Sequence, residues 1–222
     1  MIVFGGNKVN TFGGLSAWGD TISWYENAPG GTYVNIVSTD KAFAALKEDG
    51  SITVWGSLDY GGSTTNGSSY TRAPTDTGYV KIFSTNRAFA ALKEDGSVKA
   101  WGGTSHGGTD PGITSGVVNI FSFKEAFVAL KSDGSIRFWG NTNYLAGAPY
   151  SVTNANHESF TSPVVNVFSN NAAFAALKED GSIVVWGYEA YGGSTTDGNG
   201  YIGAPSSAVS YTHLTLPTIY AV

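Results

Sequence analysis

Short apolar stretches alternate with polar, glycine-rich stretches along this chain. The stretches 42–47 and 51–55 are both typical of β-strands, and the Asp49-Gly50 pair between them is typical of a two-residue hairpin turn, because both residues tolerate a positive φ. Successive side chains of a strand point to opposite faces, so Phe43 and Ala44 place apolar groups on both sides of the first strand. The pattern predicts an antiparallel hairpin whose two faces must both be covered.

This hairpin sequence occurs four times without gaps. Its copies are AFAALKEDGSITVWG (42–56), AFAALKEDGSVKAWG (88–102), AFVALKSDGSIRFWG (126–140) and AFAALKEDGSIVVWG (173–187). An apolar leader precedes each copy and supplies a third strand, so that repeats 1 to 4 have their cores at 33–56, 79–102, 117–140 and 164–187. Successive copies step by 46, 38 and 47 residues, which places the differences in length in the linkers.

Two features extend the repeat beyond these cores. A Trp-Gly pair at Trp18 stands 18 residues before Ile36, much as Trp101 stands 19 residues before Ile120, and indicates a degenerate unit before repeat 1. A short or irregular fourth strand would have to come from the linkers, where Tyr-Gly-Gly-Ser begins at Tyr60 and again at Tyr191. We therefore expect four whole units and part of a fifth.

Identical β units that are apolar on both faces can cover one another if they stack radially, as the blades of a β-propeller do. The small alanines would let neighbouring sheets approach, and Phe, Leu and Trp would fill the remaining space. The Asp-Gly turns interrupt every stretch long enough for paired helices, which excludes a helical solenoid, and a β-sandwich would show less regular periodicity. We therefore expect an all-β fold, a partial propeller that occupies residues 1–208.

The leader, the Ala-Phe-Ala-Ala-Leu-Lys-Glu-Asp-Gly-Ser-Ile stretch and the following Trp-Gly resemble the repeat of the RCC1 (regulator of chromosome condensation) family over residues 15–205. That family has a similar Leu-x-x-Asp-Gly-x-Val-x-x-Trp-Gly core, but its usual Gly-Gln-Leu-Gly is replaced here by Tyr60-Gly-Gly-Ser, His106-Gly-Gly-Thr and Tyr191-Gly-Gly-Ser. The resemblance implies an RCC1-like β-propeller. Because the family's rings usually close with about seven blades, it also implies further blades of the same longer chain, unless this ring is smaller.

The end of the chain departs from the repeat. The linker at 192–205 parallels the one at 61–74, after which the repeat predicts another leader, and none follows. Residues 209–222 instead resemble the in-frame translation of a transposase adapter used in DNA sequencing libraries. We expect this tail to be non-native read-through; the alternative is a natural apolar terminal strand, and a genomic read across Val209 decides between them.

Composition narrows the possible partners. The 222 residues have a net charge of -5 and no cluster of Lys and Arg, which disfavours direct nucleic-acid binding. Cysteine is absent, so disulfides, thiolate catalysis and Cys-ligated zinc are excluded. The sequence shows no signal-peptide pattern and no apolar run of about 18 residues, so we expect no membrane contact, while the compartment stays open.

No catalytic, cofactor-binding or metal-binding set can be assembled from the sequence. Asp197-Gly-Asn-Gly resembles the centre of an EF-hand loop, but the first and twelfth ligand positions hold Thr195 and Ser206. His106 and His157 stand in polar linkers without a second ligand at metal-binding spacing. Glu-Asp pairs recur at the same hairpin tip in three repeats, which favours a turn role over acid-base chemistry. The repeated tryptophans, whose fixed place marks them as packing residues, are Trp55, Trp101, Trp139 and Trp186.

We therefore expect a non-catalytic protein-interaction scaffold without cofactors, because rigid frameworks usually present their recognition residues on loops. Tyr and Arg are common anchors at protein interfaces. Trp24 stands outside the repeat register and is a candidate exposed anchor. The candidate partner-binding residues are large side chains outside the repeat cores: Trp24, Tyr60, Tyr70, Arg72, His106, Tyr144, Tyr150, Tyr191 and Tyr201.

Other functions stay open. The family resemblance implies guanine-nucleotide exchange on a small GTPase, or a role beside a catalytic domain of a longer chain. A carbohydrate-binding or polysaccharide-acting propeller is a further alternative, and catalysis there would need two carboxylates that converge. The unpaired carboxylates available for that role are Asp110, Glu158 and Glu189.

Overall fold

The computed structural model describes residues 32–141, 162–195 and 204. These residues form β-strands and short 3-10 helices, as expected for the all-β class. The degenerate first unit, the Asp197 loop and the tail at 209–222 lie outside the described residues.

Each repeat core folds into one antiparallel sheet, in which the leader pairs with the first hairpin strand and that strand pairs with the second. Sheet 1 contains β1 (Tyr33–Ser38), β2 (Ala42–Lys47) and β3 (Ile52–Gly56). Sheet 2 contains β5 (Tyr79–Ser84), β6 (Ala88–Lys93) and β7 (Val98–Gly103). Sheet 3 contains β8 (Val117–Phe123), β9 (Ala126–Lys131) and β10 (Ile136–Gly140). Sheet 4 contains β11 (Val164–Ser169), β12 (Ala173–Lys178) and β13 (Ile183–Gly187).

A fourth strand from a linker is present in sheet 2. This strand, β4 (Tyr70–Thr71), comes from the linker that precedes the sheet and pairs with the end of β7 through Tyr70 and Gly103. The order in that sheet is β4-β7-β6-β5. The other sheets contain three strands within the described ranges.

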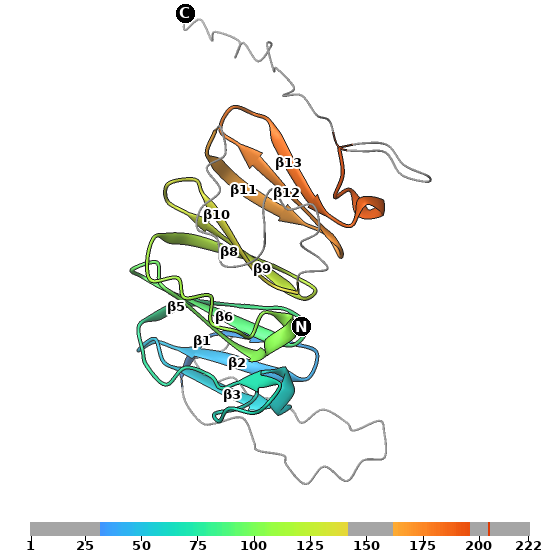
Figure 1. Cartoon of the computed structure of the whole chain (residues 1–222). Coiled ribbons are helices and arrows are strands. Elements are labelled where there is room, and N and C mark those ends of the chain that lie inside the picture. Colours follow the sequence, from blue (N-terminus) through green and yellow to red (C-terminus); the bar gives the residue numbers. More distant parts are fainter. Residues whose placement is uncertain (1–31, 142–161, 196–203, 205–222) are drawn as a thin grey trace, which may run out of the picture.

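The four sheets stack in chain order, with the leaders closest together (Figure 1). Strand β1 lies beside β5, β5 beside β8, and β8 beside β11, whereas the second hairpin strands make no comparably extensive contacts with one another. The sheets therefore diverge away from the leaders, as blades do around an axis. A β-bulge in every leader leaves one half-exposed valine on the strand: Val34, Val80, Val118 and Val165.

The apolar core consists of layers between successive sheets. Between sheets 2 and 3, Ala88 and Ala90 from one side are covered by Phe127 and Trp139 from the other. The same arrangement recurs between sheets 1 and 2 and between sheets 3 and 4. The prediction that both faces of a hairpin are buried is therefore confirmed for sheets 2 and 3, whereas Phe43 of sheet 1 is 44% exposed. The alanines are the positions where the aromatic rings of the next sheet fit.

The repeated tryptophans are packing residues, as predicted. Each stacks on the phenylalanine opposite it in the same hairpin, with ring centroids 5.3, 5.2, 5.1 and 5.3 Å apart in repeats 1 to 4. The Nε1 of Trp101 donates a hydrogen bond to the Gly61 carbonyl at 3.1 Å, and that of Trp139 donates to the Gly107 carbonyl at 3.1 Å. Each of these bonds ties a sheet to the loop that follows the preceding sheet.

The hairpin turns differ from the prediction in one respect. The connection in repeat 1 has three residues, Glu48, Asp49 and Gly50, because Lys47 N bonds to the Ser51 carbonyl at 2.9 Å and Gly50 N bonds to the Lys47 carbonyl at 3.0 Å. Gly50 alone needs a positive φ, of 75°. The aspartate recurs for another reason: its carboxylate accepts the amide of Ser51 at 2.9 Å, and the same bond closes the turn in every repeat.

The glycines whose carbonyls accept the tryptophan hydrogen bonds, Gly61 and Gly107, also contact a phenylalanine ring of the next sheet. The cost in stability of an alanine substitution should therefore depend on whether such a ring is present. At Gly107 (φ 97°) an added Cβ would lie 2.7 Å from Cδ2 of Phe127, whereas at the equivalent Gly192 (φ 91°) nothing lies within 4 Å. We expect Gly192→Ala to lower the free energy of unfolding by about 1 to 2 kcal/mol through its φ. Gly107→Ala should cost about 1 to 3 kcal/mol more through overpacking. Urea unfolding of dilute protein measures both, and equal losses would contradict this packing.

Candidate interaction face

The turn between leader and first hairpin strand lies at the same edge of every sheet, opposite the Asp-Gly hairpins. Successive turns are joined by main-chain hydrogen bonds: Asp40 N donates to the Asn86 carbonyl and Asn86 N donates to the Lys124 carbonyl, both at 2.9 Å. The turns of repeats 1 to 3 therefore form a continuous row. At the opposite edge, the hairpin of one repeat meets the next leader, for example through Tyr79 N and the Gly50 carbonyl at 3.1 Å.

The loops that follow the Trp-Gly pairs lie beside these turns. They contain the 3-10 helices η1 (Leu58–Tyr60), η2 (Thr104–His106) and η4 (Glu189–Tyr191), on one side of the stack in Figure 1. A turn side chain fixes each loop in the same way. Thr39 Oγ1 donates to the carbonyl of Tyr60 at 2.9 Å and Thr85 Oγ1 to that of His106 at 2.9 Å. Asn170 Nδ2 donates to that of Tyr191 at 2.7 Å.

We call this edge the loop-and-turn face. It comprises the turn residues 39–41, 85–87, 123–125 and 170–172 and the loop residues 57–60, 103–106 and 188–191. Three of the residues predicted from the sequence, Tyr60, His106 and Tyr191, occupy equivalent positions on it, but their surroundings differ.

Two cationic side chains of this chain, Lys41 and Arg87, pack against the ring of Tyr60. The Lys41 ammonium lies 5.2 Å from the centre of its ring, and the Arg87 guanidinium of the next repeat lies 4.8 Å from it. Both distances are typical of cation-π contacts, each of which contributes about 0.5 to 1 kcal/mol at an exposed site. The half-buried Tyr60 ring therefore supports the two cations, and the exposed groups here are those of Lys41 and Arg87.

His106 lies among charges of both signs. Its Nε2 is 3.8 Å from Oε1 of Glu125, whose other carboxylate oxygen accepts a hydrogen bond from Asn141 at 2.6 Å. Burial lowers the pKa of the His106 imidazole; Glu125 favours the charged form, but nearby Arg87 opposes it, so that the shift is downward. The imidazole is therefore held mainly neutral near pH 7.

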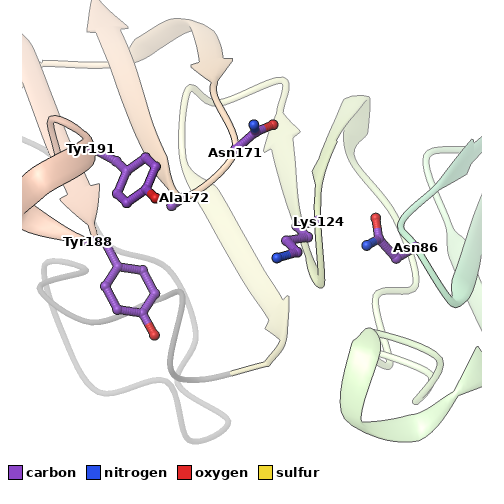
Figure 2. Close-up of a pocket in the computed structure, with 6 residues that line it drawn as sticks. All are labelled: Asn86, Lys124, Asn171, Ala172, Tyr188 and Tyr191. Carbon is purple, nitrogen blue, oxygen red and sulfur yellow. The ribbon is translucent and has the colours of Figure 1, made fainter.

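A hollow of about 570 Å³ opens on the loop-and-turn face between repeats 2 and 4 (Figure 2). Figure 2 shows Lys124 between Asn86 on one side and two tyrosines, Tyr188 and Tyr191, on the other. Asn171 and Ala172 complete the lining. The hollow combines one ammonium group, two carboxamides and two exposed phenol rings, which can accept polar and aromatic groups of a ligand.

Two predicted residues belong to the linker before sheet 2, where Tyr70 pairs with Gly103 at the border of this face. Tyr70, in β4, is half-buried and packs against Gly67, where an added Cβ would meet its ring. Arg72 is exposed, and its main-chain amide donates to Oδ1 of Asn66 at 2.9 Å. The remaining candidates lie outside the described residues: Trp24, Tyr144, Tyr150 and Tyr201.

The sequence interpretation missed the turn residues of the face, namely Lys41, Asn86, Arg87, Lys124 and Asn171. A signal for them was present. The residues between leader and hairpin differ in every repeat, reading Thr-Asp-Lys, Thr-Asn-Arg, Phe-Lys-Glu and Asn-Asn-Ala, while the sequence on either side of them is nearly constant. Variation inside a constant frame marks positions that the frame does not need.

The carboxylates considered for catalysis are separated. Asp110, in the linker after repeat 2, pairs with Lys99 at 2.6 Å, whereas Glu189 belongs to η4 after repeat 4. Glu158 lies outside the described residues. Within the part of the chain that the structure describes, no group of three or more His, Cys, Asp or Glu residues is placed to hold a metal ion, and no helix is long and apolar enough to span a bilayer.

Solved β-propellers are similar to this chain. Human WBSCR16 aligns with a TM-score of 0.55 and 18% identity over 78% of this chain and 50% of that protein. Yeast RCC1 (Prp20), solved with Kap60 bound, aligns with a TM-score of 0.52 and 19% identity over 70% of this chain and 42% of that protein. The ectodomain of the receptor kinase CR4 from Physcomitrella patens gives a TM-score of 0.50 at 14% identity, over 80% of this chain and 48% of that one.

These similarities establish the fold. The chain spans half or less of the length of these proteins, at 50%, 42% and 48%. No protein-family model and no curated protein sequence matches it. The described residues therefore form four blades of an RCC1-like β-propeller, as the repeat predicted.

The environment of His106 predicts a dependence of stability on pH. Because its pKa is lower in the folded state than the ordinary value of about 6.5, the folded protein binds fewer protons there than the unfolded chain. The stability is therefore fully present above about pH 6.5 and is lost as the pH falls through that value toward the folded pKa. Urea unfolding between pH 8 and pH 5 should show a loss that His106→Gln reduces. A wild-type protein that gains stability over this range relative to His106→Gln would show instead that the Glu125 ion pair dominates.

Proposed function

We propose that this chain is a non-catalytic protein-interaction scaffold whose partner binds the loop-and-turn face. The observation that carries the proposal is the division of the repeat into a constant frame and a variable edge. The buried alanines, the Phe-Trp stacks and the Asp-Gly turns recur in all repeats, whereas the turn residues change from Asp40 to Asn86, Lys124 and Asn171. A surface for one particular partner needs such differences between repeats.

The face is suited to binding because its main chain is already fixed. The row of turns is held by bonds between main-chain groups, and the loops are held by Thr39, Thr85 and Asn170. Binding then costs little backbone ordering, and more of the contact energy appears as affinity. The side chains of Lys41, Arg87, Lys124 and Tyr191 remain exposed for contact.

The charges of the face favour a protein partner over a nucleic acid. Lys41, Arg87 and Lys124 are interrupted by the carboxylates of Asp40 and Glu125, so the face has no continuous basic track for a phosphate backbone. Alternating charges with tyrosines and carboxamides are instead common in protein interfaces.

The absence of catalysis belongs to the same proposal. A glycosidase-type site would need two converging carboxylates, and the separation of Asp110 from Glu189 by two repeats speaks against it. The variable residues of the face are, moreover, mainly amides and cations, which position a ligand more readily than they transfer protons.

A protein with a similar fold binds other proteins. Yeast RCC1 has been solved with Kap60 bound, and its binding to Gsp1p and histones has been described. The family resemblance adds guanine-nucleotide exchange on a small GTPase as a second candidate function. Release of labelled nucleotide from Gsp1p, with and without this chain, tests that candidate directly: acceleration would favour exchange, and an unchanged rate would leave the scaffold proposal.

The scaffold proposal is tested by comparing variants on the loop-and-turn face with variants at the opposite edge of the sheets. A face variant combines Lys124→Glu with Tyr191→Ala, and a control variant combines Glu48→Ala with Glu94→Ala at the exposed hairpin tips of the opposite edge. Proteins captured by the wild type are identified, purified and titrated against both variants. We expect the face variant to bind about tenfold more weakly or worse, as for loss of interface anchors, and the control to bind like the wild type. Equal affinities of all three proteins would refute the proposed face.

A further inference from the structure

The row of turns on the loop-and-turn face opens between repeats 3 and 4. In the earlier repeats the amide of the middle turn residue donates to the carbonyl of its counterpart, from Asp40 to Asn86 and from Asn86 to Lys124, both at 2.9 Å. The next bond of this series would run from Lys124 N to the Asn171 carbonyl, and the described part of the chain contains no such bond. One main-chain donor and one main-chain acceptor of the row are therefore left over at the same place.

The hollow in Figure 2 lies at this opening, because Lys124 and Asn171 both line it. Its remaining polar and aromatic lining consists of Asn86, Tyr188 and Tyr191. Within the described ranges, the Lys124 ammonium makes no ion pair, and the carboxamides of Asn86 and Asn171 make no side-chain hydrogen bond. These three groups can therefore bind a ligand without first losing a partner within the chain.

The positive charge in the hollow is not neutralised by the residues around it. None of the described lining residues is acidic. Glu125, the neighbour of Lys124 in the chain, is engaged elsewhere: its carboxylate accepts a hydrogen bond from Asn141 at 2.6 Å and lies 3.8 Å from His106 Nε2. An ammonium group beside two amide donors favours a carboxylate, because charge-assisted hydrogen bonds are about twice as strong as neutral ones.

We propose that the hollow binds an extended peptide segment of the partner that carries an Asp or Glu side chain. This inference rests on the function proposed above and specifies what the partner contributes to the face. The carboxylate pairs with Lys124, between the carboxamides of Asn86 and Asn171. The side chain next to it packs on the rings of Tyr188 and Tyr191, which are 45% and 55% exposed.

The main chain of such a segment matches the opening in the row. The carbonyl of one of its peptide groups can accept the hydrogen bond of Lys124 N, and one of its amides can donate to the Asn171 carbonyl. Extended peptides are commonly bound in this way, with main-chain hydrogen bonds for affinity and pockets for specificity. A phosphate backbone offers acceptors only and would leave the Asn171 carbonyl without a donor. The pair of left-over groups therefore favours a peptide.

The experiment probes the full chain with an array of immobilised peptides whose ends are acetylated and amidated. The central residue is Glu, Asp, Gln, Lys or phosphoserine, and its two neighbours are varied over Tyr, Phe, Leu, Pro and Ser. The best binders are then titrated in solution by fluorescence anisotropy. Lys124→Met removes the charge from the hollow, and Lys124→Glu reverses it. Lys41→Met is the matched control, because Lys41 is an exposed turn cation of the same face outside the hollow.

We expect the tightest binders to contain Glu or Asp at the centre and to lose about tenfold in affinity when this residue is Gln, as for loss of one charge-assisted hydrogen bond. Lys124→Met should bind the Glu and Gln peptides equally. Lys124→Glu should prefer the Lys peptides, and Lys41→Met should behave like the wild type. Circular dichroism checks that all variants are folded.

Three results would overturn the inference: equal binding of Glu and Gln peptides by the wild type, a preference for phosphoserine, or no binding of any peptide. A preference for phosphoserine would indicate a phosphate site, since that group carries about two charges against the single ammonium. The function proposed above has its own test. If captured proteins still distinguish the loop-and-turn face from the opposite edge, the face binds a partner of another kind, whereas equal affinities there refute the face itself.

Discussion

Every sheet of this protein is apolar on two sides, and only a neighbouring sheet of the same kind can cover it. This constraint explains why the same residues return in each repeat. Alanine is needed where the Phe-Trp stack of the next sheet arrives, as at Ala88 and Ala90. Glycine is needed at 61 and 107, where a ring from the next sheet occupies the space of a side chain. The tryptophan then joins the sheet to the loop before it, so that packing and hydrogen bonding between sheets depend on the same residues.

The strands were predictable from the sequence because the signals that define them are local and repeated four times. Alternation over 42–47, the Asp-Gly pair and the fixed tryptophan each depend on neighbours within a few residues, and the hairpins follow these signals. The length of the turn was predicted wrongly, since the carboxylate of Asp49 closes it by a hydrogen bond to Ser51 and leaves the positive φ to Gly50 alone. A bond of that kind extends the connection by one residue without changing the composition that marks a turn.

The candidate face was only partly predictable, because its side chains are paired across repeats. Tyr60 was a reasonable anchor by residue type, but the cation that covers it, Arg87, comes from the next repeat. His106 and Glu125 meet in the same way. Such pairs depend on how sheets are placed side by side, which a single repeat does not reveal. Tyr191 occupies the position in repeat 4 that Tyr60 has in repeat 1. Its side chain is exposed, and the described residues include no cation from a following repeat to cover it.

The row of turns has one more consequence, for how such a protein changes over time. The bonds that join the turns at 40, 86 and 124 run between amide and carbonyl groups of the main chain, so they do not depend on which side chain is present. A substitution at one of these positions alters the surface chemistry and leaves the geometry in place. Each repeat can thus diverge on its own after duplication, and a chain assembled from copies of one hairpin can acquire a surface on which no two positions are alike.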